Sequence, residues 1–324
     1  MKKVLFVLAA ILFLYIGATY YLSSLVLDTP NRSLEESYGI ATGQWRVNID
    51  SLRAELPPVQ EVSFVSPVDG ITLRAWLYQR EGANCGIVLS HGYHDNRMSM
   101  LKYTPAFQDC GCDLLLYDHR GFGESDESYG SGGINEATDL LTAHAFLKAR
   151  SGLSDGQIGW LGESWGAATA LQAAGRGQVT PAFVIAESPY TDWATAITER
   201  GERDYGPALS AFTPGTFRWV AYRNGTDFAT ASPLQAAERI TAPVLLFHSR
   251  QDTLTSPDQS DRIAERIAPG LLTYHALDWG AWHAHNVVWR PREYAELIQA
   301  FIDARRPDFC PANVGQRTQV SAVD

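Results

Sequence analysis

The sequence predicts an α/β fold in which a mainly parallel sheet is covered by helices on both faces, preceded by one N-terminal transmembrane helix. Three observations predict this architecture. Apolar runs of strand length alternate with longer segments from about residue 57 onward. The N-terminal segment is an uninterrupted apolar stretch. The composition, with 45% hydrophobic and 11% aromatic residues, provides enough apolar side chains for one substantial core.

Charge in the N-terminal segment is confined to its start. After Lys2 and Lys3 the range 4–27 contains no charged residue, and this range exceeds the roughly 20 residues that a bilayer span requires. Residues 1–28 are therefore predicted to be a membrane anchor. Secretion after signal cleavage is the alternative, although the nearest cleavage motif, at residues 17–19, is poor. Lysines before the span and acidic residues after it predict a cytoplasmic N-terminus and a globular part exported to the periplasm or another extracytoplasmic space.

The rest of the chain divides into a linker, a folded domain and a tail. Residues 29–58 precede the first predicted strand and are interpreted as a juxtamembrane linker. Residues 59–310 are predicted to form the domain, and residues 311–324 a C-terminal tail. One connection within the domain is exceptionally long and rich in aromatic residues. Because structureless loops of that length are rare in compact domains, residues 190–240 are predicted to form a mostly helical cap insertion.

The strands of the predicted sheet follow in order. The runs VQEVSFVS and ITLRAWLYQ flank the turn signal Asp69-Gly70 and predict an antiparallel hairpin. Six further runs are separated by segments long enough for crossover helices, so they are predicted to be mainly parallel. These runs are GIVLSH, CDLLLYD, QIGWLG, AFVIAE, PVLLFHS and LLTYHAL. Together with the hairpin they predict a mainly parallel sheet of eight strands.

Charge and motif content narrow the class of partner. The net charge is −10 and the isoelectric point is near 5.3. Nucleic-acid binding needs a concentrated basic surface, and no run of Lys or Arg occurs, so no nucleic acid partner is expected. The sequence also shows no metal-ligand spacing of Cys and His and no glycine-rich phosphate loop. Neither a metal nor an organic cofactor is expected.

One pentapeptide, GESWG, places Ser164 between Gly162 and Gly166. The residues before it have the composition of a buried strand, and the alanine-rich residues after it have that of a helix. A strand-to-helix turn with flanking glycines is the context of a nucleophile elbow, which exposes the serine hydroxyl above a sheet. Because so short a pattern also arises by chance, the chain must supply a base, an acid and oxyanion donors as well.

Four landmarks occur in the order found in the α/β-hydrolase superfamily. They are LSHGYHDNR (89–97), DHRGFGES (118–125), GESWG, and PVLLFHSRQD (243–252). The chain resembles this superfamily from about residue 60 to residue 305, and it is most similar to the short-lid branch of serine aminopeptidase-like and monoacylglycerol-lipase-like serine hydrolases. The resemblance implies an α/β-hydrolase fold with a helical cap and a serine hydrolase that works without a cofactor.

The resemblance also implies a catalytic triad in the chain order Ser, Asp, His. Ser164 is the implied nucleophile. Asp252 follows the seventh predicted strand, where the family places its acid, although Ser249 stands where the family usually has glycine. The base is either His283 or His285, and the family pattern Gly-x-x-His favours His283. A serine hydroxyl needs such a base, and the base needs a carboxylate that holds its tautomer.

Oxyanion donors are implied at two backbone N–H groups. One belongs to Trp165, directly after the nucleophile, and the other to Tyr93 in the loop after the third strand. Together these residues predict a serine hydrolase of carboxylic esters, thioesters or small amides that forms an acyl-enzyme, with a carboxylesterase, lipase or thioesterase expected before a peptidase. Aromatic residues in the cap suggest an apolar acyl or aryl group on a small-molecule or lipid-like substrate. The alternative is a catalytically silent, membrane-tethered binding protein of the same fold.

The superfamily topology implies where the four cysteines lie. Its third and fourth strands are parallel neighbours, and Cys85 and Cys112 precede the motifs that end those strands by equal spacings, so the two are expected side by side at the edge opposite Ser164. Cys110 and Cys310 follow helices that the family brings to that edge. The resemblance therefore implies two disulfides, Cys85–Cys112 and Cys110–Cys310, if the domain is exported. Free thiols are the alternative, and four cysteines allow three complete pairings.

Overall fold

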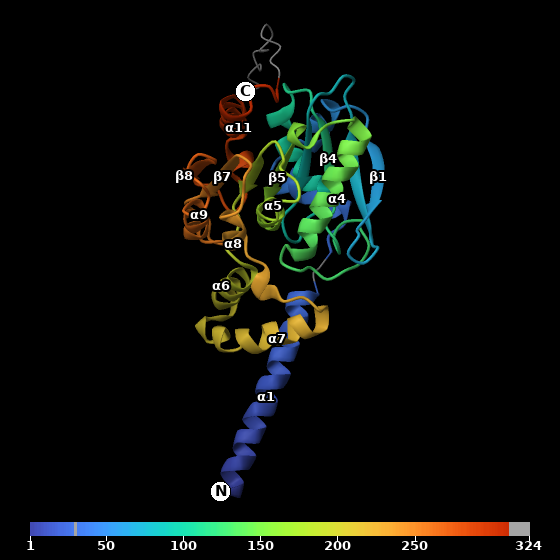
Figure 1. The fold of residues 1–324 in the computed structure, drawn as a ribbon. Coiled ribbons are helices and arrows are strands. Elements are labelled where there is room, and N and C mark those ends of the chain that lie inside the picture. Colours follow the sequence, from blue (N-terminus) through green and yellow to red (C-terminus); the bar gives the residue numbers. More distant parts are fainter. Residues whose placement is uncertain (29–30, 311–324) are drawn as a thin grey trace.

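The sheet is the centre of the molecule. The structure, a computed structural model, describes residues 1–28 and 31–310, and within them eight strands form one sheet in the order β1-β2-β4-β3-β5-β6-β7-β8 (Figure 1). β2 runs antiparallel to β1 and to β4, and the other neighbours are parallel. The strands are β1 (Gln60–Val65), β2 (Thr72–Tyr78), β3 (Gly86–Ser90), β4 (Asp113–Tyr117), β5 (Ile158–Glu163), β6 (Val184–Glu187), β7 (Val244–Ser249) and β8 (Leu272–Leu277). The predicted mainly parallel sheet is confirmed, and the predicted tail 311–324 lies outside the described residues.

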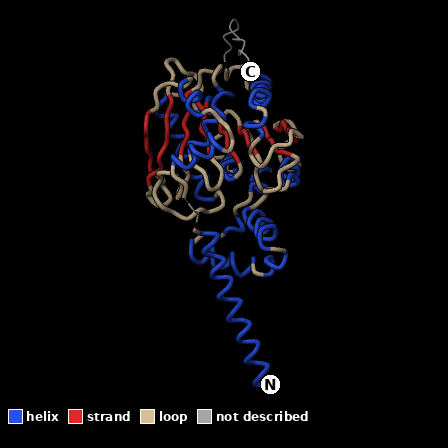
Figure 2. Tube along the Cα trace, turned by 180° about the vertical axis from the view of Figure 1, so that it is seen from behind, coloured by secondary structure: helices blue, strands red, loops and turns tan. Residues whose placement is uncertain are grey.

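Helices cover both faces of this sheet, and Figure 2 shows the molecule from behind. Consecutive strand residues alternate between the faces, so Leu115 belongs to one core cluster and Leu116 to the other. The Leu115 face is covered by α4 (Ile134–Ser151), α5 (Trp165–Gly175), α8 (Pro233–Ala237) and α9 (Pro257–Ala264). The Leu116 face is covered by η1 (Arg97–Phe107), α10 (Asn286–Trp289) and α11 (Pro291–Arg305). A short turn of helix, η2 (Asp155–Gln157), leads into β5. Strands buried on both sides explain why their sequences are nearly continuous apolar runs.

The cap lies beyond the carboxyl ends of the parallel strands. It contains α6 (Trp193–Tyr205), η3 (Pro207–Ala211), α7 (Thr213–Asn224) and η4 (Phe228–Thr230). Asp192 begins α6 because its carboxylate accepts the backbone N–H of Thr195 at 2.8 Å. Gly206, with φ of 95°, separates α6 from η3 because most L residues avoid that conformation. The predicted helical cap is confirmed, and it projects from one end of the domain (Figure 1).

The apolar N-terminus forms a single helix, α1 (Lys2–Leu27). By length and composition it fits a membrane span or a signal sequence. Its first part is exposed over the residues 4–14, whereas Thr19, Ser23 and Leu27 are buried. The buried residues belong to the end of α1 that packs along α7 of the cap.

Residues 29–58, predicted as a linker, contain two packed helices in their described part. They are α2 (Leu34–Gly43) and α3 (Ile49–Ala54). A capping box starts α2, because the Ser33 hydroxyl accepts the Glu36 N–H while the Glu36 carboxylate accepts the Ser33 N–H. Both helices contact η1 and contribute buried side chains to the core of that face. The segment has structure because its apolar residues find a partner surface, which its own composition does not reveal.

The cysteines lie at the amino ends of the strands. Gly86 pairs with Asp113 in the β3–β4 register, so the residues just before them are level. Cys85 and Cys112 are joined with a Cα separation of 4.6 Å. Cys110 and Cys310 are joined with a Cα separation of 4.4 Å. Both pairs match those that the superfamily topology implied, and the second ties the end of η1 to the end of α11.

Candidate active site

Ser164 stands on a turn that only small neighbours permit. Its φ of 51° and ψ of −112° are unusual for a residue with a side chain. A Cβ at Gly162 would lie 2.3 Å from the backbone of Gly166, and a Cβ at Gly166 would lie 2.1 Å from the carbonyl oxygen of Ser90. The Ser164 N–H donates to the Glu187 carbonyl at 2.7 Å, which fixes the turn to β6. The sequence pattern and the observed strand-to-helix turn therefore agree with a nucleophile elbow.

His283 connects Ser164 to Asp252. Its Nε2 lies 2.7 Å from the Ser164 Oγ, and its Nδ1 lies 2.6 Å from the Asp252 Oδ2. Because an ionised carboxylate only accepts hydrogen bonds, Nδ1 carries a hydrogen and Nε2 can accept the hydrogen of the serine hydroxyl. The structure thus brings three residues from separate loops into one hydrogen-bonded chain.

Asp252 is held ionised by several donors. Its Oδ1 accepts the backbone N–H groups of Leu254 at 2.8 Å and Thr255 at 3.0 Å. Burial alone raises the pKa of Asp252, but the charge of His283 and hydrogen bonds from His248 and His283 outweigh it, so the pKa lies below its usual range. A carboxylate that stays ionised at neutral pH can stabilise a cation on His283.

The two residues implied as oxyanion donors lie together beside Ser164. A Cβ built on Gly92 would be 3.5 Å from the Ser164 Cβ, so the loop after β3 passes directly over the nucleophile. The rings of Tyr93 and Trp165 stack with centroids 5.0 Å apart. Burial raises the pKa of Tyr93 to about 12, so its phenol is neutral and acts as an apolar ring here.

His285 occupies a different place from His283. Its Nδ1 lies 2.6 Å from the His283 carbonyl oxygen and therefore carries a hydrogen, since a carbonyl only accepts. Its ring packs edge-on against Trp45 with centroids 5.0 Å apart. Burial, followed by the charge of Lys102, lowers the pKa of His285, which keeps the ring neutral. The contacts of His285 therefore support the loop that carries His283.

His248 is a residue of the site that the sequence reasoning did not single out. Its Nε2 lies 3.0 Å from the Asp252 Oδ2 and 3.1 Å from the Thr255 carbonyl oxygen. Since a carbonyl only accepts, Nε2 carries a hydrogen that it shares between the two oxygens, and Nδ1 accepts from the Ser260 hydroxyl at 2.6 Å. A polar residue in the buried strand β7, four positions before the acid, was the available signal.

A buried ion pair involves Glu163, the residue directly before Ser164, and the sequence reasoning did not single it out either. Lys102 Nζ lies 2.7 Å from the Glu163 carboxylate, and both side chains are at most 5% exposed. The Tyr103 hydroxyl donates to the same carboxylate at 2.8 Å. Burial alone raises the pKa of Glu163, but the charge and hydrogen bond of Lys102 outweigh it and lower the pKa. The Lys102 ammonium also lies 4.7 Å from the ring centroid of Trp45, so residues before the first strand help to support the site.

Ser249, where the family usually has glycine, connects the loops that carry Asp252 and His283. Its hydroxyl donates to the Ala281 carbonyl at 2.6 Å. Gln251 makes a second connection, because its side-chain oxygen accepts the Gly280 N–H at 3.2 Å. Both contacts join the loop that carries Asp252 to the loop that carries His283. The departure from the family pattern therefore adds a contact and leaves the acid in place.

Aromatic residues of the cap pack in different directions. Trp193 packs against Trp165 with centroids 4.4 Å apart, beside the nucleophile. Phe212 and Trp219 instead pack against α1. Within the residues 1–28 and 31–310, no group of three or more His, Cys, Asp or Glu is arranged to hold a metal ion.

A model of the family described as serine aminopeptidase, S33, matches residues 83–232. YqkD, an uncharacterised protein of Bacillus subtilis, is 27% identical over 305 residues, which cover 94% of this chain and 98% of that protein. Thiohydrolase aneE of Aspergillus aculeatus is 32% identical over 117 residues, which cover 35% of this chain and 36% of the thiohydrolase. The esterase Pf2001 of Pyrococcus furiosus has a TM-score of 0.63 at 20% identity, covering 79% of this chain and 95% of the esterase. The predicted α/β-hydrolase fold is confirmed by this likeness.

Proposed function

We propose that the chain is a serine hydrolase of the α/β-hydrolase superfamily that cleaves carboxylic ester or thioester bonds, with small amides as a further class. The observation that carries this proposal is the hydrogen-bonded chain from Ser164 through His283 to Asp252. The hydrolase domain is proposed to comprise residues 59–310, and the insertion at residues 190–240 carries its cap in α6, η3, α7 and η4.

In the proposed reaction, Ser164 Oγ attacks the acyl carbon while its hydrogen passes to Nε2 of His283. Asp252, hydrogen-bonded to Nδ1, stabilises the imidazolium that forms. The backbone N–H groups of Trp165 and Tyr93 stabilise the developing oxyanion. His283 then gives the proton to the departing alcohol or thiol, which leaves an acyl-enzyme. A water molecule, deprotonated by His283, releases the carboxylic acid and restores Ser164.

The acyl side of the substrate is proposed to be apolar. The nucleophile is bordered by a cluster of aromatic rings contributed by Tyr93, Trp165 and Trp193. Such a surface favours an acyl or aryl group over a charged one, because a charge placed there would lose its hydration without a partner. An esterase and a thiohydrolase are among the proteins that the chain resembles, which supports esters and thioesters as the bonds cleaved.

The domain is proposed to be held at a membrane by α1 and exported. The helix has the length and hydropathy of a span, and the buried residues near its C-terminal end pack on the cap. The two disulfides support export, because disulfides persist in oxidising compartments. Membrane fractionation together with sequencing of the mature N-terminus tests this. A fully soluble protein that begins near residue 20 would refute the anchor.

A fluorophosphonate probe tests the proposed nucleophile, because it labels only an activated serine. The wild-type protein should form a covalent adduct that maps to Ser164, and Ser164→Ala should form none. The Thr169→Ala variant serves as a control for a neighbouring hydroxyl on α5. Absence of an adduct in folded wild-type protein would favour the alternative, a catalytically silent binding protein. A series of p-nitrophenyl esters of increasing chain length then tests the apolar acyl group, and equal rates across the series would contradict it.

A further inference from the structure

We infer that the cap and the C-terminal half of α1 form one unit that inserts into the extracytoplasmic leaflet of a lipid bilayer, and that the substrate is an ester-bearing lipid taken from that leaflet. The inference rests on the proposed anchor and the proposed hydrolase function. The part of α1 that precedes its contact with the cap is shorter than the thickness of a bilayer.

The contact between α1 and the cap begins at the middle of the helix. The Tyr15 ring stacks on Phe212 with centroids 5.5 Å apart, and its hydroxyl donates to the Ala211 carbonyl at 3.2 Å. Five residues later, Tyr20 packs edge-on against Trp219 with centroids 5.3 Å apart. Side-chain packing and a hydrogen bond therefore fix α1 along α7 well before the helix ends.

The contact continues to the end of α1. The Arg223 guanidinium donates to the Ser23 hydroxyl at 2.9 Å and to the Ser24 hydroxyl at 2.8 Å. Leu27, the last residue of the helix, is 1% exposed. Because Arg223 of α7 donates to two hydroxyls of α1, the C-terminal end of α1 is held in place against α7.

The uncovered part of α1 is too short for a bilayer. Residues 4–14 are exposed along their whole length, and at about 1.5 Å per residue they measure roughly 16 Å. The hydrocarbon core of a bilayer is about 30 Å thick. If α1 spans the bilayer, the hydrocarbon therefore extends to the level at which Tyr15 and Tyr20 meet the cap. The α7 face of the cap must then lie inside the leaflet beside α1.

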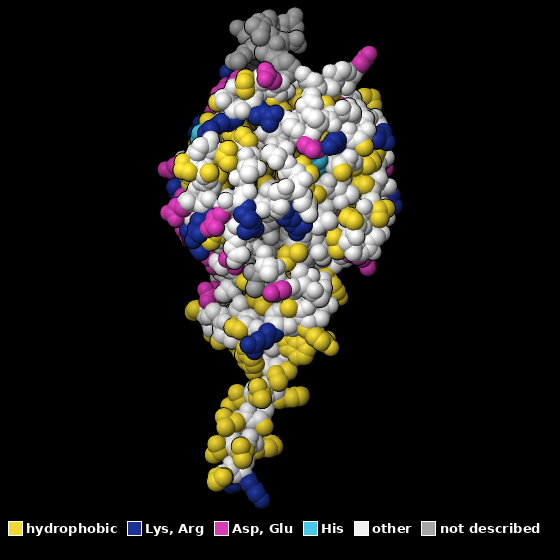
Figure 3. All heavy atoms as spheres, viewed as in Figure 1, with side chains coloured by type: hydrophobic (Ala, Val, Ile, Leu, Met, Phe, Trp, Pro, Cys, Tyr) yellow, Lys and Arg dark blue, Asp and Glu magenta, His cyan; other side chains and the backbone are white. Residues whose placement is uncertain are grey.

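The surface of the cap at this level suits a lipid environment. The range 205–217, which includes η3 and the start of α7, contains no charged residue. Tyr205 and Tyr222 are 74% and 80% exposed, as expected for aromatic residues at a membrane interface. Figure 3 shows hydrophobic side chains along α1 and on the cap around the place where α1 leaves it. Arg218, the first charge after this range, is long enough to reach lipid phosphates.

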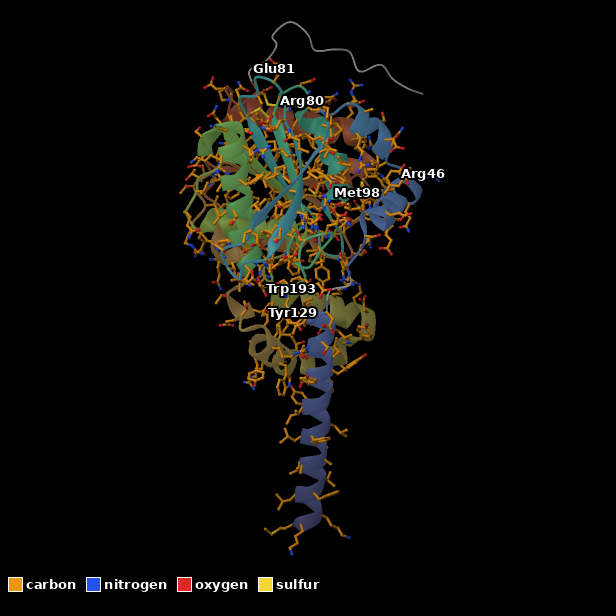
Figure 4. The ribbon with its side chains drawn as sticks, turned by 90° about the vertical axis from the view of Figure 1, so that its right-hand side faces the viewer. Arg46, Arg80, Glu81, Met98, Tyr129 and Trp193 are labelled. Atoms are coloured by element: carbon orange, nitrogen blue, oxygen red, sulfur yellow. A yellow bond between two sulfur atoms is a disulfide. The ribbon has the colours of Figure 1, made fainter. Side chains whose placement is uncertain are left out.

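A continuous apolar cluster connects this surface with the nucleophile. It includes Leu27 at the end of α1, Val220 of α7, and Trp165 directly after Ser164. Figure 4 shows Trp193, another member, at the junction between the cap and the domain. A leaflet that reaches the cap would therefore bring the ester or thioester of a lipid at headgroup depth close to this junction, with its acyl chain beside apolar side chains.

A second copy of the chain is the competing occupant of the cap surface. A protein partner would cover the exposed tyrosines equally well. It would leave α1 with roughly half of the apolar length that a span requires, however, whereas lipid around the cap removes that deficit. The length argument therefore favours lipid.

Depth measurements on the full chain in phosphatidylcholine vesicles test the inference. An environment-sensitive fluorophore is attached at Ala208→Cys on η3, at Leu12→Cys as a membrane-embedded reference, and at Asp303→Cys on α11 as an exposed control. The four native cysteines are disulfide-bonded, so labelling is directed to the introduced one. Nitroxide-labelled lipids should quench the labels at 208 and 12 and leave 303 unquenched. Quenching at 12 without quenching at 208 would overturn the inference, as would an oxidative disulfide between the unlabelled Ala208→Cys variants of two copies.

Activity on two substrates separates this inference from the proposed function. Tyr222→Asp should lower hydrolysis of a long-chain ester in vesicles by about tenfold, because a carboxylate is expensive at lipid depth. Hydrolysis of a soluble short-chain ester should stay unchanged, and Ala304→Asp, an exposed change on α11, should alter neither rate. Equal loss on both substrates would contradict lipid docking. No hydrolysis of either substrate by the wild type, with quenching at 208 retained, would refute the proposed hydrolase and with it the lipid substrate, while the insertion of the cap would stand.

Discussion

The two ends of the parallel strands are built from different kinds of contact. At the carboxyl ends, Ser164, Asp252 and His283 meet through hydrogen bonds between loops. At the amino ends, two disulfides join β3 to β4 and η1 to the C-terminal end of α11. In Figure 4, Trp193 lies where the cap joins the domain, whereas Arg80 and Glu81 mark the opposite end. The disulfides thus lie at the end of the sheet opposite to the loops whose geometry the proposed chemistry needs.

One strand pair shows how the two ends are related. In the register of β3 and β4, Gly86 pairs with Asp113 and Ser90 pairs with Tyr117. The same level pairing that brings two cysteines together at one end therefore positions the loop over the nucleophile at the other. The Cys85–Cys112 disulfide can therefore stabilise the pairing of β3 and β4 without contacting the substrate.

The largest effect on activity is expected at the carboxyl ends of the strands, from loss of the proposed base. His283→Ala should lower kcat by about 10⁶-fold, because the serine then has no proton acceptor. His285→Ala should lower kcat far less, since His285 contacts the His283 carbonyl and Trp45. Steady-state kinetics on a p-nitrophenyl ester measure both. A larger loss for His285→Ala than for His283→Ala would reverse the assignment.

Removing the disulfides tests the opposite end. Their sequence separations are 200 for Cys110–Cys310 and 27 for Cys85–Cys112. On the loop-entropy model, replacing Cys110 and Cys310 by serine should lower the free energy of unfolding by about 5 kcal/mol, because that disulfide closes the longer loop. Replacing Cys85 and Cys112 by serine should lower it by about 3.5 kcal/mol. Urea titration measures the loss, and kcat of the folded fraction should stay unchanged. A fall in kcat without a fall in stability would mean that the two ends are coupled.

A smaller effect is expected from removing the hydrogen bond that His248 donates to Asp252. Because the pKa of Asp252 is depressed in the folded state, its stabilising contribution is present above the ordinary carboxyl pKa near 4 and is lost as the pH falls through the depressed pKa. His248→Leu removes one of the hydrogen bonds that lower this pKa, so stability should depend less on pH between about 2 and 5. We also expect kcat to fall by about tenfold to a hundredfold.

Unfolding titrations across this pH range, together with kinetics, measure both effects. His248→Gln is the matched variant, since its amide can still donate to the carboxylate, and it should recover part of the pH dependence and part of kcat. Full activity in His248→Leu would remove the proposed positioning role.

The smallest effect is expected from Ser249→Ala. This change removes the hydrogen bond to the Ala281 carbonyl, which contributes about 1 kcal/mol. Loosening the loop of His283 should lower kcat about twofold to fivefold and lower the midpoint of urea unfolding only slightly, by the amount that corresponds to about 1 kcal/mol. Ser51→Ala, an exposed change on α3, is the control. A loss in stability comparable with that of a disulfide would show that the contact acts on the fold and not on the loop.

Local patterns in the sequence predicted most of the fold. The eight apolar runs became the eight strands of the described sheet, because their length and bounding turn residues depend only on neighbours in the chain. The turn at Ser164 was predicted for the same reason, since Gly162 and Gly166 are what its close backbone contacts require. The helices within the range 29–58 escaped prediction because their stability comes from packing on η1.

The sequence by itself determined which residue types were present, where the strands lie along the chain, and the turn that exposes Ser164. Only the tertiary structure decided which of two neighbouring histidines reaches that serine, since His283 lies 119 positions away and no local propensity encodes the distance. It likewise decided that His248 supports Asp252 and that α1 packs on the cap. Contacts of this kind depend on how separate elements pack, whereas periodicity and turn chemistry are properties of each segment alone.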